Sequence, residues 1–157
     1  MSELGPRPPT PEEAARNRRI IRVVAVLFVA VSLFVFAWGY VVTAGTRERA
    51  QATDVALRSV GWAILGYAAQ HEGRFPSKAA EFEAAAKGTP PSSVPAGEGW
   101  PSTQAAALEG SPAMDVATAL GSVAVTWDPN GQLPPVLSVT SGVSGLGTVE
   151  MVNGWLT

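Results

Sequence analysis

The side chains that could do chemistry are few and scattered in this chain. It has one histidine, no cysteine and 13 acidic residues among 157. Without cysteine, thiol catalysis and cysteine-ligated zinc or iron–sulfur sites are excluded. A serine hydrolase would place its nucleophile in a G-x-S-x-G turn, and the nearest segment, residues 142–146 (GVSGL), lacks the last glycine. We therefore expect no catalytic residues, no cofactor site and a protein that is not an enzyme.

The remaining polar groups predict structure rather than ligand binding. Glycines between residues 142 and 147 follow an expected strand but open no helix, so they predict a loop and not a phosphate cradle. His71 lies at the end of an apolar helical stripe, which is typical of a structural histidine. Residues 128–131 (DPNG) could offer oxygens of Asp128 and Asn130 to calcium, but these residue types also form a reverse turn. We expect the turn and no metal site, and calcium near Asp128 stays an open alternative.

The longest apolar stretch of the chain predicts its membrane element. Residues 23–44 (VVAVLFVAVSLFVFAWGYVVTA) contain no charged side chain. As a helix rising about 1.5 Å per residue, this stretch is long enough for a hydrocarbon layer of about 30 Å. Trp38 and Tyr40 lie near its end, where amphipathic rings prefer the boundary between lipid and water. We predict one transmembrane helix over residues 20–44.

The charges on either side of this segment predict its orientation. Four arginines precede it within seven residues, namely Arg16, Arg18, Arg19 and Arg22. On the other side, Arg47 and Arg49 flank Glu48. The positive-inside rule therefore predicts a cytoplasmic tail over residues 1–19 and an extracytoplasmic domain over residues 45–157. In a bacterium this means a single-pass protein of the inner membrane with a periplasmic domain, and Arg18, Arg19 and Arg22 are its expected residues at the cytoplasmic interface.

A cleaved signal peptide is the alternative to a permanent anchor. Val42-Thr43-Ala44 has the small-residue spacing that signal peptidase accepts. The apolar run of 22 residues is, however, much longer than the roughly 7–15 residues of a signal core. We favour the uncleaved anchor.

The membrane segment is expected to belong to a longer helix. Residues 1–9 hold three prolines and predict disorder, whereas Thr10 and Glu13 form a capping box around Pro11, so a helix should begin at Pro11. Spacings of three and four residues then define one stripe of an amphipathic helix: Ala50, Thr53, Leu57, Val60, Ile64, Tyr67 and His71. Gly73 suits a helix C-cap, so we expect the helix to end near Glu72, with a bend possible at Gly45.

The end of this stripe resembles the type IV pilins and the pseudopilins of type II secretion. In that family a membrane helix continues into an amphipathic half, which ends in a tyrosine, a turn with glycine, an aromatic residue and proline. The matching residues here are Leu57, Val60, Ile64, Tyr67, Gly73, Phe75 and Pro76. The resemblance implies that they pack on a small antiparallel sheet and that the protein is a component of an assembly.

The processing site of that family is missing. Pilins carry a glycine followed by a Phe-Thr-Leu-Ile-Glu-type run, whereas here Ile20-Ile21 follows arginine. No acidic residue lies between Glu13 and Glu48. We therefore expect a pilin-like domain on a permanent anchor.

The remainder of the domain predicts short elements. Residues 77–87 should form a helix with Ser77 as N-cap and Phe82 inward, and residues 88–101 a loop with Trp100 in the core. A second short helix should run from Ser111-Pro112 to Gly121.

Strands are expected over the last part of the domain, residues 122–157. Residues 122–126 and 136–140 should pair across the 128–131 turn. Residues 148–152 should add a third strand, followed by a turn at Asn153-Gly154 that lets Trp155 and Leu156 pack. The predicted fold is α+β, with one long helix over a three- or four-stranded antiparallel sheet.

These expectations point to a structural role. We expect a non-enzymatic interaction subunit of a bacterial secretion or pilus-type envelope machine. The alternative is an accessory subunit of another large membrane complex, respiratory or photosynthetic, and a sensor domain is a weaker third reading. The expected partners are the membrane and other membrane-protein subunits, reached through the transmembrane helix and the outer lobe. With a net charge of −2, neither nucleic acid nor a small-molecule substrate is expected.

Overall fold

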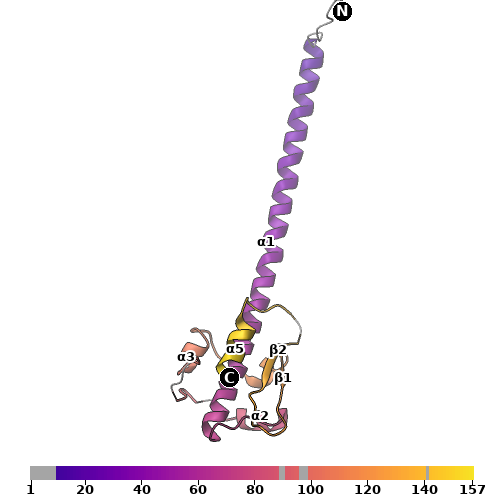
Figure 1. Cartoon of the computed structure of the whole chain (residues 1–157). Coiled ribbons are helices and arrows are strands. Elements are labelled where there is room, and N and C mark those ends of the chain that lie inside the picture. Colours follow the sequence, from indigo (N-terminus) through magenta and orange to yellow (C-terminus); the bar gives the residue numbers. More distant parts are fainter. Residues whose placement is uncertain (1–9, 89–90, 96–98, 141) are drawn as a thin grey trace, which may run out of the picture. The chain divides into compact units, whose positions relative to one another are not determined.

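The architecture is α+β, with one long N-terminal helix and a small antiparallel sheet (Figure 1). The computed structural model describes residues 10–88, 91–95, 99–140 and 142–157. The chain divides into two compact units, Met1–Ala44 and Gly45–Thr157, and helix α1 (Pro11–Gln70) contributes to both. The predicted disordered tail, residues 1–9, lies outside the described residues.

Helix α1 begins where its capping signal predicts. The backbone N–H of Thr10 donates to Glu13 Oε2 at 2.8 Å, and the N–H of Glu13 donates to Thr10 Oγ1 at 3.4 Å. This reciprocal pair satisfies two N–H groups that the first turn leaves without helical partners. The bonds from Thr10 lower the pKa of the Glu13 carboxyl below its ordinary value. The predicted start at Pro11 is confirmed.

The other end of α1 is closed by the predicted glycine. Gly73 has φ of +83°, and its N–H donates to the carbonyl of Ala68 at 2.8 Å. A left-handed glycine whose N–H donates to the carbonyl five residues earlier is a standard helix C-cap, because the carbonyls of the last turn need donors. The helix ends at Gln70, two residues before the predicted Glu72, and Gly45 within it is helical.

The C-terminal unit is built around one face of α1. The side chains of Leu57, Val60 and Ile64 are completely buried. Helix α5 (Thr148–Leu156) packs on this part of α1 (Figure 1). At the contact α1 has Gly61, where an added Cβ would collide with the side chain of Val152. Glycine at this position therefore sets how closely the two helices approach.

The sheet is a single hairpin. Strands β1 (Val123–Thr126) and β2 (Val136–Val139) pair antiparallel, with Val125 opposite Leu137. In the turn between them, Asp128 Oδ2 accepts the N–H groups of Gln132 at 2.9 Å and Leu133 at 3.0 Å. The N–H of Gly131 donates to the carbonyl of Asp128 at 3.0 Å. Both strands and the turn are confirmed.

The predicted third strand is wrong, because residues 148–152 begin helix α5. The predicted turn at Asn153-Gly154 is also wrong, since both residues lie within α5. The Asn153 side chain occupies the edge of β2 in place of a strand. Its Oδ1 accepts the N–H of Leu137 at 2.8 Å and its Nδ2 donates to the Leu137 carbonyl at 2.9 Å. One side-chain amide thus bonds both backbone groups of Leu137, as a neighbouring strand would. The described sheet has two strands instead of the predicted three or four.

The short helices differ from their predicted bounds. Helix α2 (Ala79–Ala86) buries Phe82 as expected, but its N-cap is Lys78 and not Ser77. Helix α3 (Gln104–Ala107) was not predicted and is capped by Thr103. Of the predicted loop, residues 89–90 and 96–98 lie outside the described residues.

The second predicted helix, from Ser111-Pro112, is also displaced. Helix α4 (Val116–Ala119) begins later, with Asp115 as its N-cap. The N–H of Met114 donates to Ser59 Oγ on α1 at 3.0 Å. This bond holds the segment before α4 against α1, which explains why the helix starts after it.

Four polar side chains of α1 hold loops of the C-terminal unit. Besides Ser59, Asp54 Oδ1 accepts the N–H of Gly145 at 2.8 Å, and Trp62 Nε1 donates to the Pro91 carbonyl at 3.1 Å. Arg58 donates to the Ala107 carbonyl at 3.1 Å and pairs with Glu109 at 2.7 Å. These contacts explain how a domain with a small sheet keeps its long loops in place.

Candidate functional site

Among the described residues, no three His, Asp or Glu side chains lie together as metal ligands do. The carboxylate of Asp128, the candidate calcium ligand, accepts backbone N–H groups of its own turn. Those from Leu133 and Gln132 lower the pKa of the Asp128 carboxyl. The hydrogen bonds of the turn thus explain why an aspartate stands at position 128. The absence of enzymatic activity stays a prediction. The candidate functional features are therefore surfaces, of which two are apolar.

The first is the apolar helix surface, formed by the exposed hydrophobic residues of α1 between Ile20 and Val42. None of the most apolar stretch of α1 is buried. Phe36 and Tyr40 are 75% and 72% exposed. Contiguous apolar surface of this size marks contact with a membrane or a partner. Among the residues that the structure describes, one helix, α1, is long and apolar enough to cross a membrane.

At the end of the apolar helix surface, one hydroxyl is bonded back to the helix itself. The hydroxyl of Thr43 donates to the Gly39 carbonyl at 2.7 Å. Trp38 stacks on Phe34, with ring centroids 6.4 Å apart. A hydroxyl bonded back to its own helix is compatible with hydrocarbon, where a group without a partner costs several kcal/mol.

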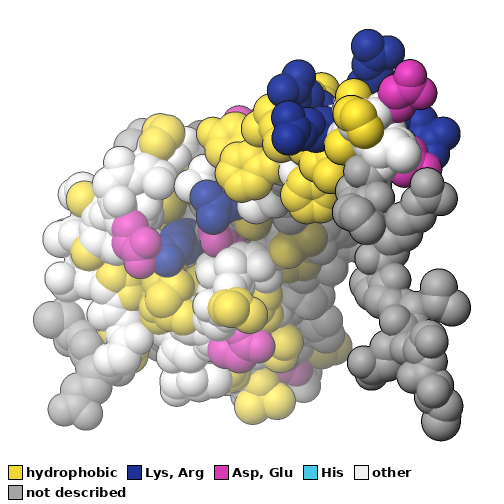
Figure 2. Space-filling view, turned by 90° about the horizontal axis from the view of Figure 1, so that it is seen from above, with side chains coloured by type: hydrophobic (Ala, Val, Ile, Leu, Met, Phe, Trp, Pro, Cys, Tyr) yellow, Lys and Arg dark blue, Asp and Glu magenta, His cyan; other side chains and the backbone are white. Residues whose placement is uncertain are grey.

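The predicted interface residues are exposed. Trp38 and Tyr40 lie in the last turns of the predicted span, at 65% and 72% exposure. Arg18, Arg19 and Arg22 are exposed in the turns before it. Figure 2 shows basic side chains gathered beside apolar ones where α1 begins. A charged segment thus passes directly into an apolar one.

The predicted packing residues differ in burial. Leu57, Val60 and Ile64 are fully buried. Tyr67 and Pro76 are also buried. Phe75 is half-buried and Gly73 is exposed. The N–H of Phe75 donates to the Gly131 carbonyl at 3.0 Å, which joins the segment after α1 to the hairpin turn. All of these residues except Gly73 contribute to the core, and Phe75 also reaches the surface.

A cluster around Tyr67 fastens the start of α2 to α1. The Tyr67 hydroxyl donates to Glu81 Oε1 at 2.5 Å. Glu81 Oε2 accepts the N–H of Ser77 at 3.0 Å and its hydroxyl at 2.8 Å. The bond to Tyr67, followed by those from Ser77, lowers the pKa of Glu81 to about 2. The same bond to Glu81, with burial second, raises the pKa of Tyr67 to about 12.

His71 belongs to this cluster as a structural residue. Its ring stacks on that of Tyr67 with centroids 3.9 Å apart and planes 8° from parallel. His71 Nδ1 lies 2.8 Å from the Tyr67 carbonyl, one turn earlier in the chain. His71 was predicted as the last residue of the apolar stripe of α1, and its ring stacks on Tyr67, the preceding residue of that stripe. The bond between Tyr67 and Glu81 was not predicted. The four-residue spacing of Ser77 and Glu81 near a helix start could have indicated only the local bond between those two residues.

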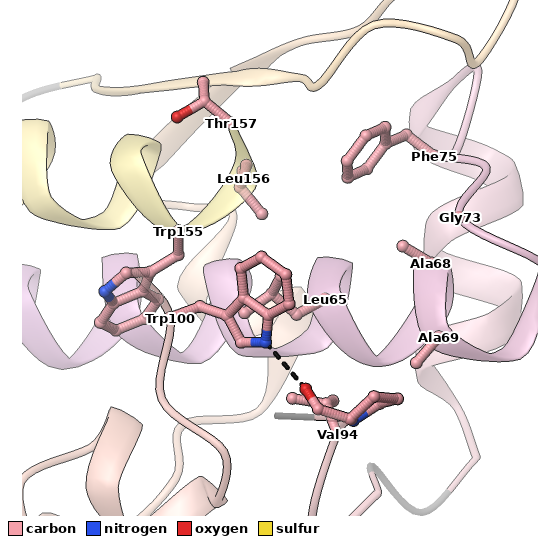
Figure 3. A pocket seen from close by; sticks show the side chains of 11 residues that line it. Leu65, Ala68, Ala69, Gly73, Phe75, Val94, Trp100, Trp155, Leu156 and Thr157 are labelled. Carbon is pink, nitrogen blue, oxygen red and sulfur yellow. Dashed lines mark hydrogen bonds between the residues drawn. The ribbon is translucent and has the colours of Figure 1, made fainter. Parts of the chain in front are cut away.

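The second apolar feature is a pocket of about 370 Å³ in the C-terminal unit (Figure 3). Its walls include Leu65 from α1, Trp155 from α5, and Phe75 and Trp100 from the loops. Trp100 packs against the core and donates from Nε1 to the Pro95 carbonyl at 3.0 Å. Trp100, which was predicted to lie in the core, therefore also forms a wall of the pocket. The pocket was not predicted, because it joins segments far apart in the chain.

Comparison with known proteins does not extend this description. No protein-family model, no curated protein and no solved structure matches the chain. The case for its function therefore depends on the surfaces and contacts described above.

Proposed function

We propose that this chain is a single-span bacterial membrane protein and a non-enzymatic structural subunit of a secretion or pilus-type envelope machine. One observation carries the proposal. The exposed apolar segment of α1 continues as the same helix into the stripe that forms the core of the C-terminal unit. A helix that can both anchor a protein in a membrane and form the core of its folded unit suits a membrane-anchored interaction module.

A permanent anchor agrees better with α1 than a cleaved signal peptide. Residues 42–44 lie in the interior of α1, which continues to Gln70. Proteolytic cleavage favours exposed, irregular chain over the middle of a helix. The capping box at Thr10 also starts the helix ahead of the apolar segment. We therefore propose that the anchor stays attached.

The flanking charges support an orientation with the N-terminus in the cytoplasm. Arg16, Arg18, Arg19 and Arg22 precede the apolar segment, whereas the arginines after it flank an acid. By the positive-inside rule, the C-terminal unit lies on the periplasmic face of the inner membrane.

The pilin-like character of the C-terminal unit is part of the proposal. It is supported by the long helix with a buried stripe, the glycine turn after Tyr67, and the antiparallel hairpin. The two-stranded sheet and helix α5 differ from the three- or four-stranded sheet that was predicted for this unit. The proposed role therefore depends on the helix and the surfaces of the unit rather than on strand pairing.

An accessory subunit of a respiratory or photosynthetic complex is the second candidate. It is favoured by the start of α1, because Thr10 and Glu13 cap the helix ahead of the apolar segment. A processed pilin would begin its helix at a new N-terminus within that region. A helix capped further upstream is better suited to a fixed subunit than to a polymerising one.

Extraction of the tagged full-length chain in mild detergent, followed by mass spectrometry of the intact complex, tests both candidates. Secretion or pilus components in stoichiometric amounts support the first, and a respiratory or photosynthetic complex supports the second. A chain whose residues 20–44 are replaced by an unrelated span serves as control and shows whether partners need this helix. Recovery of the protein alone contradicts both candidates.

Orientation is tested separately with protease added to intact spheroplasts. Loss of the C-terminal unit, while a cytoplasmic marker stays uncut, is the expected result. A protected C-terminal unit contradicts the proposed orientation.

A further inference from the structure

A basic groove lies on α1 where the apolar helix surface begins. It has a volume of about 520 Å³ and is lined by Arg18, Arg19 and Arg22 together with Pro11, Ala14 and Ala15. The proline and alanines are short, so the arginines form its walls. We call this feature the arginine groove. The arginines lie at the end of α1 where basic side chains gather in Figure 2.

The arginines of the groove have no carboxylate partner among the described residues. Within the described residues, the recorded ion pair joins Arg58 to Glu109 in the C-terminal unit. The nearby Glu13 carboxylate accepts the Thr10 N–H instead. Three exposed guanidinium groups thus share one side of a helix, and their N–H donors are open to an anion from outside the chain.

The spacing of these arginines suits a phosphate group. Arg18 and Arg22 are four residues apart and share a helix face, and Arg19 is adjacent. A guanidinium group presents several N–H donors in a planar fork that matches the oxygens of a phosphate. Two or three such forks on one face can contact one phosphate from different sides.

The same face becomes apolar one turn later. Val26 and Val29 follow Arg22 by four and seven residues, and they are 69% and 55% exposed. A ligand along this face would meet charge at one end and hydrocarbon at the other. Free phosphate satisfies only the first of these, whereas an anionic phospholipid satisfies both. We propose that the arginine groove binds the headgroup phosphate of an anionic membrane phospholipid, an inference that rests on the proposed membrane anchor.

Arg16 distinguishes such a groove from general attraction to a charged surface. It carries the same charge and belongs to the same short cluster, but it does not line the groove. Two residues before Arg18, it lies about 160° around the helix from it. Surface attraction depends on charge alone, so it would weaken equally on loss of Arg16 or Arg18. Binding in the groove would depend on Arg18 and Arg22 and not on Arg16.

The test uses the full-length protein in nanodiscs of phosphatidylcholine with a minor fraction of phosphatidylglycerol. Native mass spectrometry after release into detergent measures the ratio of the two lipids that stay bound. We expect phosphatidylglycerol to be enriched on the wild-type protein. R18Q and R22Q should each reduce the enrichment about fivefold, and R16Q should leave it unchanged. Added inorganic phosphate should not displace the lipid.

Several outcomes would overturn the inference. Equal loss in R16Q and R18Q would assign the effect to overall charge, and displacement by inorganic phosphate would assign it to the free anion. Absence of enrichment on a wild-type protein that resists carbonate extraction would reject the groove and leave the anchor intact. A wild-type protein that does not enter the bilayer would reject the anchor and the groove together. Because nanodiscs expose both faces, a changed orientation of a variant in cells does not affect the measurement.

Discussion

At the scale of single residues, one hydrogen-bonded pair explains how the segment after α1 is held. Tyr67 and Glu81 join two helices, and Ser77 donates two further hydrogen bonds to the carboxylate. The folded state favours the charged form of Glu81 and the neutral form of Tyr67, because each stabilises the other. The pair therefore connects folding to pH in two separate ranges.

Stability should fall at both ends of the pH scale. The pKa of Glu81 is lowered from 4.5 to about 2, so its contribution is complete above about pH 4.5 and is lost as pH falls toward about 2. The pKa of Tyr67 is raised from 10 to about 12, so its contribution is complete below about pH 10 and is lost as pH rises toward about 12. Denaturant unfolding of the full chain in detergent, followed by tryptophan fluorescence across pH, measures both.

Variants assign these losses to the pair. E81Q should remove the acidic loss and Y67F the alkaline one, and each should be less stable than the wild type near neutral pH. Matched controls are E83Q on the exposed side of α2 and Y40F on the apolar helix surface. Equal pH profiles for E81Q and E83Q would show that the pair does not couple folding to pH.

At the scale of elements, helix α5 replaces an expected strand and also completes the sheet. Its apolar residues pack on α1, while Asn153 pairs with the backbone of Leu137 at the edge of β2. An exposed strand edge is prone to pair with other chains, and a side-chain amide that occupies it reduces this risk. The helix thus contributes to the core and protects the hairpin.

The two bonds of Asn153 can be separated by substitution. N153A removes both and should cost about 1–3 kcal/mol of unfolding free energy, because it leaves part-buried backbone groups without partners. N153D keeps an acceptor for the Leu137 N–H but loses the donor to its carbonyl. Hydrogen exchange should therefore show the Leu137 amide unprotected in N153A and protected in N153D. Equal protection of that amide in the wild type and N153A would contradict this role.

Two glycines should respond in opposite directions to replacement by alanine. At Gly61 the new Cβ meets the fully buried, stiff side chain of Val152, so G61A should destabilise the protein by about 1–3 kcal/mol. At Gly154, within α5, nothing lies within 4 Å of the added carbon. G154A should therefore stabilise α5 by about 0.5–1 kcal/mol, because alanine loses less backbone entropy. Denaturant midpoints measure both, and a stabilising G61A would show that α1 and α5 are not closely packed.

At the scale of the whole molecule, two units of different character share one helix. In the unit Met1–Ala44 the described part of α1 exposes its apolar side chains, whereas the described residues of Gly45–Thr157 bury theirs around α1. The exposed part needs hydrocarbon or a partner, and the buried part needs only its own loops and helix α5. This division is why the function is proposed from surfaces and not from a catalytic centre.

Two valines of similar exposure test the membrane anchor. Val31 in the apolar segment is 54% exposed and Val136 in β2 is 56% exposed. V31R should oppose insertion by about 2.5–3.5 kcal/mol, because it places a charge at the centre of the span, whereas V136R should have no effect on insertion. Membrane insertion during synthesis in vitro, followed by carbonate extraction, measures the difference. Equal membrane association of the two variants would contradict the transmembrane assignment.

The sequence by itself determined the features that depend on neighbouring residues. The capping box at Thr10, the glycine C-cap after α1 and the turn at Asp128 each bond within about five positions along the chain. The apolar run and the buried stripe of α1 were likewise legible, because hydrophobic periodicity is local. These signals located the long helix and the hairpin and identified the α+β class.

Only the tertiary structure decided the features that join distant residues. Whether residues 148–152 formed a strand or a helix depended on Asn153 reaching Leu137, 16 positions away, and on the space beside Gly61. The start of α4 depended on a bond between Ser59 and Met114, 55 positions apart. Packing against distant partners outweighs the small local preference of short apolar segments, and this is why α5 and the apolar pocket could not be predicted from the chain alone.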